Sequence, residues 1–292
     1  MSLVTVIPVG IDNAARAEFL VDFISQLNQR KPRGHALIVF DGTHPEFIDR
    51  IKISAEMAFS SFDLLVPATI NSKDKMASAI ARRNHIFMSA ALHCQSNYKH
   101  PWLWLEPEST PTNPKWIENI EQAYDSQVRR YYMTHLRDSE TSPRFPLSVG
   151  VWHQGAYYDM QKAMDAAPEI PFERVAGEMI VSKSTKSRMF QPLKIQDEAS
   201  FQNVWPEAQI VVGDTAGGYT EFLRGQGVHL PKAFPGVTRE DESWRAGIDL
   251  IPDHPDFKNQ ERETVGTITP KIDLRTKAGR ALKAANNGHE KV

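Results

Sequence analysis

Two glutamates, Glu106 and Glu108, are the residues best placed to do chemistry, because they directly follow the apolar run Trp102-Leu-Trp-Leu105. Side chains two positions apart in an extended segment point to the same side, so both carboxylates can face one site. Pro107 between them restricts the backbone. Such a pair suits Mg²⁺ or Mn²⁺, which proteins hold through one or two carboxylates together with substrate phosphates. The spacing alone fits two solvated acids in a loop equally well.

Short apolar runs closed by turn residues predict the strands that would carry such a site. These runs occupy residues 4–10, 36–40, 62–66 and 102–105, and helical patterns lie between them at about 12–27, 45–59 and 75–94. Asp12 and Asn13 are suited to cap the first of these helices. The alternation predicts an α/β fold with a mainly parallel sheet and helices on both faces. Ligands of such sheets bind at the carboxyl ends of the strands, where this chain has Gly10, Asp41 and Glu106.

The composition is that of a core-forming globular chain with a balanced charge. Of 292 residues, 41% are apolar and 24% charged, which excludes wholesale disorder. Lys and Arg number 34 against 36 Asp and Glu, which excludes a uniformly basic nucleic-acid coat but not a local basic patch. The single Cys94 cannot form an internal disulfide, and no apolar run approaches the ~20 residues that cross a bilayer. We therefore expect a cytoplasmic protein without a membrane partner.

A longer pattern surrounds the acidic pair. It comprises Arg83 and Asn84 in a stretch with small residues, the acidic motif itself, and the pair Trp116-Ile117. This pattern resembles nucleotide-sugar glycosyltransferases of the GT-A fold, in particular their large inverting family. The Glu-Pro-acidic-x-x-Pro form, which ends here at Pro111, resembles glycosyltransferases of bacteriophages and large viruses. One departure is the second acidic position, where the family usually has Asp and this chain has the longer Glu108.

The resemblance implies roles for individual residues in the first half. Glu106 and Glu108 would bind Mn²⁺ or Mg²⁺, and the co-substrate would be a nucleotide sugar, with a UDP-sugar foremost. Residues implied in donor binding are Pro8, Val9, Gly10, Asp41, Arg83 and Asn84. Arg83 would hold the donor diphosphate, for which its guanidinium fork is well shaped. Taken without the resemblance, Asp41-Gly42 fits a simple turn equally well and Arg83 a surface helix.

The second half must supply the acceptor site and, in an inverting enzyme, a general base. The candidates for acceptor binding are Trp152, His153 and Tyr157, since aromatic rings stack on sugars or bases. Trp152 suits a core position at least as well. Glu178 is the first candidate for the base and Glu173 the second, each near the place where the family has its catalytic acid. A retaining enzyme would need no such base.

The layout predicts three parts of the chain. Residues 1–125 form the donor-binding half, residues 126–251 an irregular acceptor-binding and catalytic half with strands near 130–134, 147–151 and 209–212, and residues 252–292 a polar extension with a basic tail. The phage resemblance raises DNA with a hydroxymethylated base as acceptor, in the host cytoplasm if the chain is phage-encoded. The basic residues that would then contact phosphate are Lys271, Arg275, Lys277, Arg280 and Lys283.

Several alternatives remain open at this point. The chain could be a nucleotide-sugar or nucleic-acid binding protein of the same fold without catalysis, or a nucleotidyltransferase, which would release pyrophosphate. His229 and His254 could complete a metal site. The segment Val211-Val-Gly-Asp-Thr-Ala-Gly-Gly218 lacks the Lys-Ser/Thr ending of a phosphate-binding P-loop, so a plain turn is favoured there over an acceptor-side loop.

Overall fold

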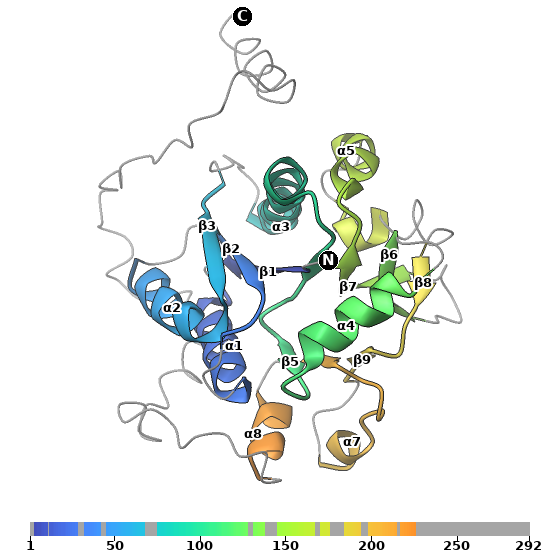
Figure 1. Ribbon diagram of the computed structural model, residues 1–292. Coiled ribbons are helices and arrows are strands. Elements are labelled where there is room, and N and C mark those ends of the chain that lie inside the picture. The colour runs from blue at the N-terminus through green and yellow to red at the C-terminus, as the bar shows by residue number, and fades with distance from the viewer. Residues whose placement is uncertain are drawn as a thin grey trace, which may run out of the picture. The chain divides into compact units, whose positions relative to one another are not determined.

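The computed structural model describes residues 3–10, 12–28, 32–41, 45–67, 75–127, 131–137, 145–166, 170–175, 184–193, 198–214 and 217–225. Figure 1 shows their arrangement as two sheets with surrounding helices. The strands are β1 (Val4–Gly10), β2 (His35–Asp41), β3 (Ser61–Leu65), β4 (Trp102–Trp104), β5 (Ser109–Pro111), β6 (Tyr132–Arg137), β7 (Phe145–Trp152), β8 (Ser184–Lys186), β9 (Phe190–Pro192) and β10 (Ile210–Val212). The helices are α1 (Ala14–Leu27), α2 (Pro45–Ala58), α3 (Lys75–His93), η1 (Cys94–Tyr98), α4 (Trp116–Asp125), α5 (Ala156–Ala166), α7 (Glu198–Gln202) and α8 (Gly218–Gly225).

The described part of the main sheet has seven strands in the order β3-β2-β1-β4-β7-β6-β8. β1 pairs in parallel with both β2 and β4, and β2 pairs in parallel with β3. Four neighbouring strands therefore bring their carboxyl ends to one edge. β7 is antiparallel to β4 and β6, while β8 is parallel to β6. The predicted α/β fold with a mainly parallel sheet is confirmed.

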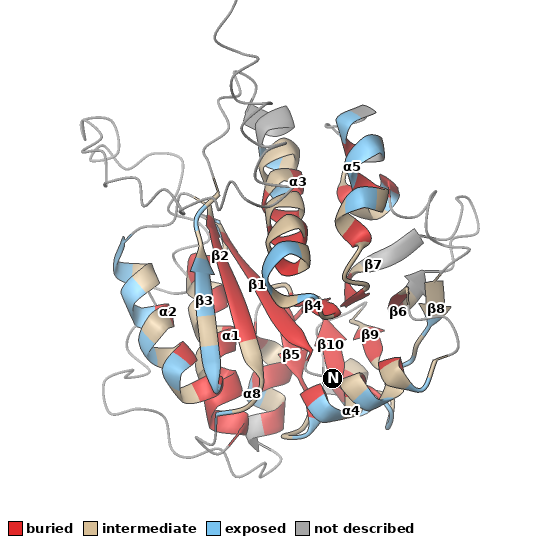
Figure 2. Ribbon diagram, turned by 45° about the horizontal axis from the view of Figure 1, so that its top comes forward, coloured by how far each residue is buried: buried red, intermediate tan, exposed pale blue. Residues whose placement is uncertain are grey.

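Both faces of this sheet are apolar, as a sheet covered on two sides requires. Ile7 and Ile38 belong to one buried cluster, whereas their chain neighbours Val6 and Leu37 belong to the other. This alternation follows from the two-residue period of a strand. α1, α2 and α4 supply residues to the first cluster, and α3 and α5 supply residues to the second (Figure 2). Helices on both faces are thus confirmed.

Aromatic side chains fill the second cluster and fix the elements that flank the edge of the sheet. Phe87 of α3 stacks on Phe172 with ring centroids 4.0 Å apart, and it also contacts Trp104 at 5.3 Å. Trp102 and Trp152 stack at 5.7 Å across the β4–β7 pair. These contacts hold α3, β4 and the helical turn 172–175 against one another. Residues on these three elements that point past the aromatic layer must therefore lie close together.

A smaller sheet, in the order β5-β10-β9, continues from the end of β4. β10 is antiparallel to β5 and parallel to β9. Among the described residues, no helix is both long enough and apolar enough to cross a membrane. Residues 226–292 lie outside the described part, and with them the predicted extension at 252–292. The three-part division at 125 and 251 stays a prediction.

Candidate active site

A cleft of about 710 Å³ opens at the carboxyl ends of β1, β2 and β4. This is the edge at which the sequence predicts a ligand. The cleft brings together residues that are up to 205 positions apart, counting from Pro8 to Gly213. The predicted site residues that line it are Pro8, Gly10, Asp41, Arg83, Glu106, Glu108 and Glu173. Val9 is fully buried beneath them in the core, as its alternate position on β1 requires.

The end of β1 is shaped by a contact that differs from the predicted helix cap. Asn13 is the residue before α1, but its side chain makes no cap hydrogen bond. Instead its Oδ1 accepts a hydrogen bond from the backbone N–H of Gly10, at 2.7 Å. The side chain therefore closes the turn between β1 and α1. Both Asp12 and Asn13 line the cleft as a result.

Glu106 and Glu108 lie half-buried where β4 ends, with the intervening Pro107 buried. Burial and the charge of Glu106 raise the pKa of Glu108, although its backbone and the guanidinium groups of Arg16 and Arg83 oppose the shift. The backbone carbonyl of Glu108 accepts hydrogen bonds from the N–H groups of Gly213, at 2.9 Å, and Asp214, at 2.8 Å. The acidic motif is thereby fixed to the loop that follows β10.

The acidic pair fits a hard divalent cation. Two carboxylates that repel each other in a partly desolvated cleft are stabilised by a positive ion between them. Within the described part of the chain, no group of three or more His, Cys, Asp and Glu side chains is arranged to hold a metal ion. Of the described residues, Glu106 and Glu108 would hold such an ion, and donor phosphates and water commonly complete the coordination of Mg²⁺.

Arg83 forms an ion pair with the acidic motif. Its guanidinium forms ion pairs with both Glu106 and Glu173, the latter at 2.5 Å. It also lies over the ring of Phe172, with 5.4 Å from Cζ to the centroid. Burial lowers the pKa of Arg83, but the neighbouring carboxylates outweigh that effect and raise it. Arg83 thus joins the helix α3, the end of β4 and the turn 172–175 at the cleft.

Asn84 has a different position from its neighbour. It is 4% exposed, and its Nδ2 donates to the carbonyl of Ile170 at 2.8 Å while its Oδ1 accepts from the N–H of Phe172 at 3.0 Å. An amide side chain can satisfy a donor and an acceptor at once, so it holds an irregular backbone segment in place. Asn84 therefore positions the segment that carries Glu173 and is not among the described residues that line the cleft. Its role in donor binding stays a prediction.

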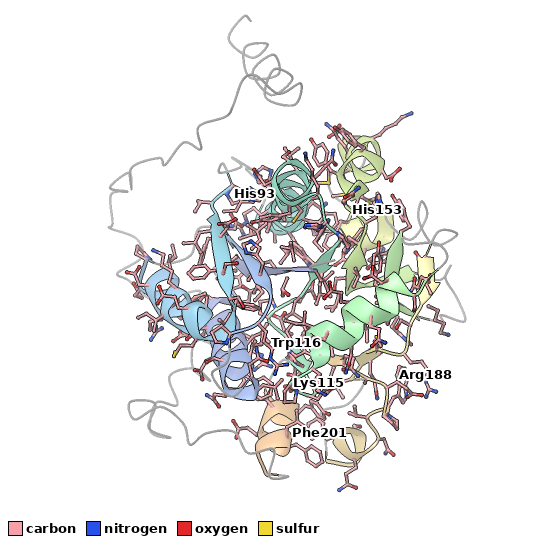
Figure 3. All side chains as sticks on the ribbon, viewed as in Figure 1. His93, Lys115, Trp116, His153, Arg188 and Phe201 are labelled. Carbon is pink, nitrogen blue, oxygen red and sulfur yellow. The ribbon has the colours of Figure 1, made fainter. Side chains whose placement is uncertain are left out.

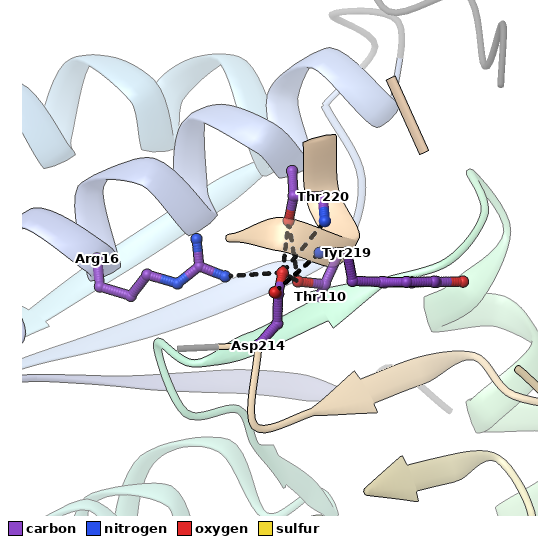
Figure 4. Close-up of polar contacts among 5 residues, drawn as sticks. All are labelled: Arg16, Thr110, Asp214, Tyr219 and Thr220. Carbon is purple, nitrogen blue, oxygen red and sulfur yellow. Dashed lines mark hydrogen bonds and ion pairs between the residues drawn. The ribbon is translucent and has the colours of Figure 1, made fainter. Parts of the chain in front are cut away.

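A buried carboxylate anchors the loop after β10 (Figure 4). Asp214 is 0% exposed and accepts hydrogen bonds from Arg16 at 3.2 Å, from the hydroxyl of Thr110 at 2.8 Å, and from the N–H groups of Tyr219 at 3.0 Å and Thr220 at 3.2 Å. These partners come from α1, β5 and the first turn of α8. The N–H contacts also satisfy helix-terminal donors of α8. The segment 211–214 is consequently a fixed support for Glu108, a role that sequence reasoning missed.

The three predicted acceptor residues lie away from the cleft lining. Trp152 is 1% exposed within the aromatic core. His153 lies between β7 and α5 (Figure 3), and its Nδ1 accepts from the N–H of Gly155 at 3.0 Å. Burial lowers the pKa of His153. Tyr157 is half-buried on α5. None of the three is among the described residues that line the cleft, so acceptor binding by them stays a prediction.

Other predicted residues lie outside the described part of the chain. These are the base candidate Glu178, the histidines His229 and His254, and the tail residues Lys271, Arg275, Lys277, Arg280 and Lys283. The cleft also contains residues that sequence reasoning did not assign to a site, namely Asp12, Arg82, Ser148 and Arg174, and it includes Gly213 from the segment 211–218, for which the sequence favours a plain turn. Asp12 could have been found from its position just after a strand end. Arg174 and Gly213 reach the cleft only through tertiary folding.

Neither a family model nor a curated protein matches the chain. Solved structures do match in fold. The galactosyltransferase LgtC, solved with donor and acceptor sugar analogs, gives a TM-score of 0.53 at 9% identity, with 84% of this chain and 100% of that chain covered. The glycosyltransferase GlyE of Streptococcus pneumoniae in its apo form gives 0.51 at 10% identity, covering 76% of this chain and 60% of that chain. The chain therefore has the GT-A-like fold of nucleotide-sugar glycosyltransferases.

Proposed function

We propose that this protein transfers a sugar from a nucleotide-sugar donor to an acceptor hydroxyl, with a divalent metal ion held by Glu106 and Glu108. The observation that carries the proposal is the cleft, where an acidic pair, an arginine and the ends of β1 and β2 meet. The GT-A-like fold supports it, because in open α/β sheets the ligand binds outside the carboxyl ends of the strands.

In this proposal the donor spans the cleft from β2 to β4. The nucleoside lies along Pro8 and Gly10 and reaches Asp41, while the diphosphate lies over the acidic pair. When bound, the metal ion stabilises the negative charge that develops on the leaving diphosphate. Arg83 can add charge-assisted hydrogen bonds to the same phosphates, since its fork matches two oxygens at once.

The acceptor hydroxyl would enter from the side of the turn 172–175. Glu173 lines the cleft and can accept the hydroxyl proton if the reaction inverts the anomeric carbon. Glu178 remains the other candidate for this base. DNA with a hydroxymethylated base is the acceptor class we propose to test first. Its turnover should then fall steeply with salt, because phosphate contacts release counterions. Equal turnover at 50 and 200 mM salt would rule out a DNA acceptor.

A thermal-shift screen of nucleotide sugars, with and without Mn²⁺, tests donor binding. A donor at about 100 times its Kd stabilises the folded state by about 2.7 kcal/mol. For a chain of this size, that corresponds to a shift of about 5–10 °C. Glu108→Gln should remove the Mn²⁺-dependent part of the shift and leave the fold intact. If no nucleotide sugar shifts the melting temperature, the donor proposal fails.

One observation favours a second candidate, a nucleotide-sugar binding protein without catalysis. Arg83 occupies two carboxylates that the metal and the base would need, and Glu108 stands where the resembling family usually has Asp. Donor binding without release of nucleoside diphosphate, with every acceptor offered, would favour this candidate. A nucleotidyltransferase would instead release pyrophosphate, which the same product assay distinguishes.

A further inference from the structure

The ion pairs of Arg83 concern two groups that the proposed reaction requires in other roles. Arg83 Nη2 contacts both Glu106, a proposed metal ligand, and Glu173, a candidate base. The side chains of Glu106 and Glu173 are 16% and 12% exposed, whereas that of Arg83 is 45% exposed. Both carboxylates are thus more enclosed than Arg83, which lines the cleft. Because Arg83 is the most exposed of the three side chains, it is the partner that can move away most readily.

The other arginines near the cleft are placed differently. Arg82 and Arg174 also line it, but neither has a carboxylate partner among the described residues. Arg16 is bound to the buried Asp214 and is 12% exposed. Among the described arginines, Arg83 is therefore the one that forms an ion pair with the acidic motif, through Glu106, while Arg16 acts on Glu108 from its position on Asp214.

A guanidinium and a divalent cation cannot both stay close to the same carboxylate without strong mutual repulsion. Binding of the cation to Glu106 therefore displaces Arg83. The donor diphosphate offers the displaced fork a new partner with two parallel oxygens. Each ligand then makes the other bind more tightly, and the coupling must be equal in both directions.

We propose that Arg83 competes directly with the divalent cation for the carboxylate of Glu106, so that cation and donor diphosphate bind cooperatively. The inference rests on the proposed function in taking Glu106 and Glu108 as the cation ligands. It adds a reason for the cation to bind weakly on its own. It also gives Arg83 two successive partners, the acidic motif before donor binding and the diphosphate afterwards.

The test is a titration of Mn²⁺ alone into the full-length protein, with free Mn²⁺ followed by electron paramagnetic resonance. Arg83→Met removes the competitor, so we expect Mn²⁺ to bind about three- to tenfold more tightly than in the wild type, the range for a partly exposed charge-assisted pair. Arg174→Met is the matched control, because it removes the same charge from the same cleft without breaking an ion pair to a described carboxylate. We expect it to change the affinity by less than about twofold. Thermal melts establish that each variant is folded.

A second arm repeats the titration with the nucleoside diphosphate that gives the largest thermal shift. This ligand should increase the Mn²⁺ affinity of the wild type more than that of Arg83→Met, because only the wild type has a guanidinium that can move from Glu106 to the diphosphate. The double variant Arg83→Met/Glu108→Gln should lose the tighter Mn²⁺ binding, which locates the ion at the acidic motif. Unchanged or weaker Mn²⁺ binding in Arg83→Met would overturn the competition while leaving the proposed transferase intact. Absence of Mn²⁺ binding in every variant, with and without nucleotide, would overturn both.

Discussion

Substitution of Asp214 should destabilise the protein far more than its loop position suggests. Asp214→Ala leaves the guanidinium of Arg16, 12% exposed, without its carboxylate, and it leaves the N–H groups of Tyr219 and Thr220 without their acceptor. Removing one partner of a buried ion pair costs about 3–5 kcal/mol. Because domains are stable by about 5–15 kcal/mol, the variant should still fold. Its melting temperature should fall by about 10 °C.

A double-mutant cycle separates the ion pair from the other contacts of Asp214. Arg16→Met should cost about 1–3 kcal/mol, because it leaves a carboxylate that still accepts hydrogen bonds from Thr110 and the first turn of α8. The double variant Arg16→Met/Asp214→Ala should be more stable than the sum of the two single losses predicts, by about 1–3 kcal/mol, since no unpaired charge remains. Urea denaturation followed by tryptophan fluorescence gives each free energy of unfolding.

Two results would contradict a buried, energetically coupled ion pair between Arg16 and Asp214. A loss below about 1 kcal/mol for Asp214→Ala would mean that water replaces the network at no cost. Additive losses would mean that Arg16 and Asp214 do not interact energetically. The cycle also bears on the site, because the N–H groups of Gly213 and Asp214 hold the carbonyl of Glu108. A shifted loop should therefore weaken donor binding with Mn²⁺ in the thermal-shift assay.

The remaining predictions concern the acidic motif, a strand pair and the segment that carries Glu173. Burial and the charge of Glu106 raise the pKa of Glu108. With respect to this carboxyl, the free energy of unfolding is therefore highest below the unfolded pKa of about 4.3 and falls as the pH rises through the folded-state pKa. In EDTA, Glu108→Gln should melt above the wild type at about pH 7.5 and together with it at about pH 4, whereas equal melting at both pH values would contradict this sign. Gly150→Ala should lower the free energy of unfolding in urea by about 1–3 kcal/mol, because the alanine Cβ would lie 2.7 Å from the carbonyl oxygen of Met133. An unchanged urea midpoint would show that β6 and β7 move apart at little energetic cost. Asn84→Ala should cost about 2–4 kcal/mol by losing two buried hydrogen bonds, and unchanged proteolysis of the segment near Ile170 would contradict its positioning role.

The parts of the fold that could be predicted from sequence are those set by local patterns. β1, β2 and β4 are short apolar runs with polar or turn residues at their ends, and this pattern alone places Gly10, Asp41 and Glu106 at one edge. The helices between them follow from three- and four-residue spacing of apolar side chains. No observed end of these strands and helices differs from its predicted position by more than two residues.

The parts that could not be predicted depend on contacts between distant residues. Asn84 is a plausible ligand residue from its neighbour Arg83, yet its amide is used by a backbone segment 86 positions away. Asp214 has a turn-like local sequence, and its role depends on Arg16, 198 positions earlier. Trp152 suits a sugar platform or a core equally well by type, and only the packing against Trp102 shows it in the core.

In the proposed reaction, Glu106 and Glu108 hold a metal ion under a nucleotide-sugar donor. The most direct test measures release of nucleoside diphosphate from the donor that gives the largest thermal shift, in Mn²⁺ and in EDTA, for the wild type and for Glu108→Gln. Metal stabilisation of the leaving group is worth several kcal/mol, so both EDTA and the substitution should slow release by about 100-fold or more. Release by Glu108→Gln at the wild-type rate, or release that EDTA leaves unchanged, would contradict the claim.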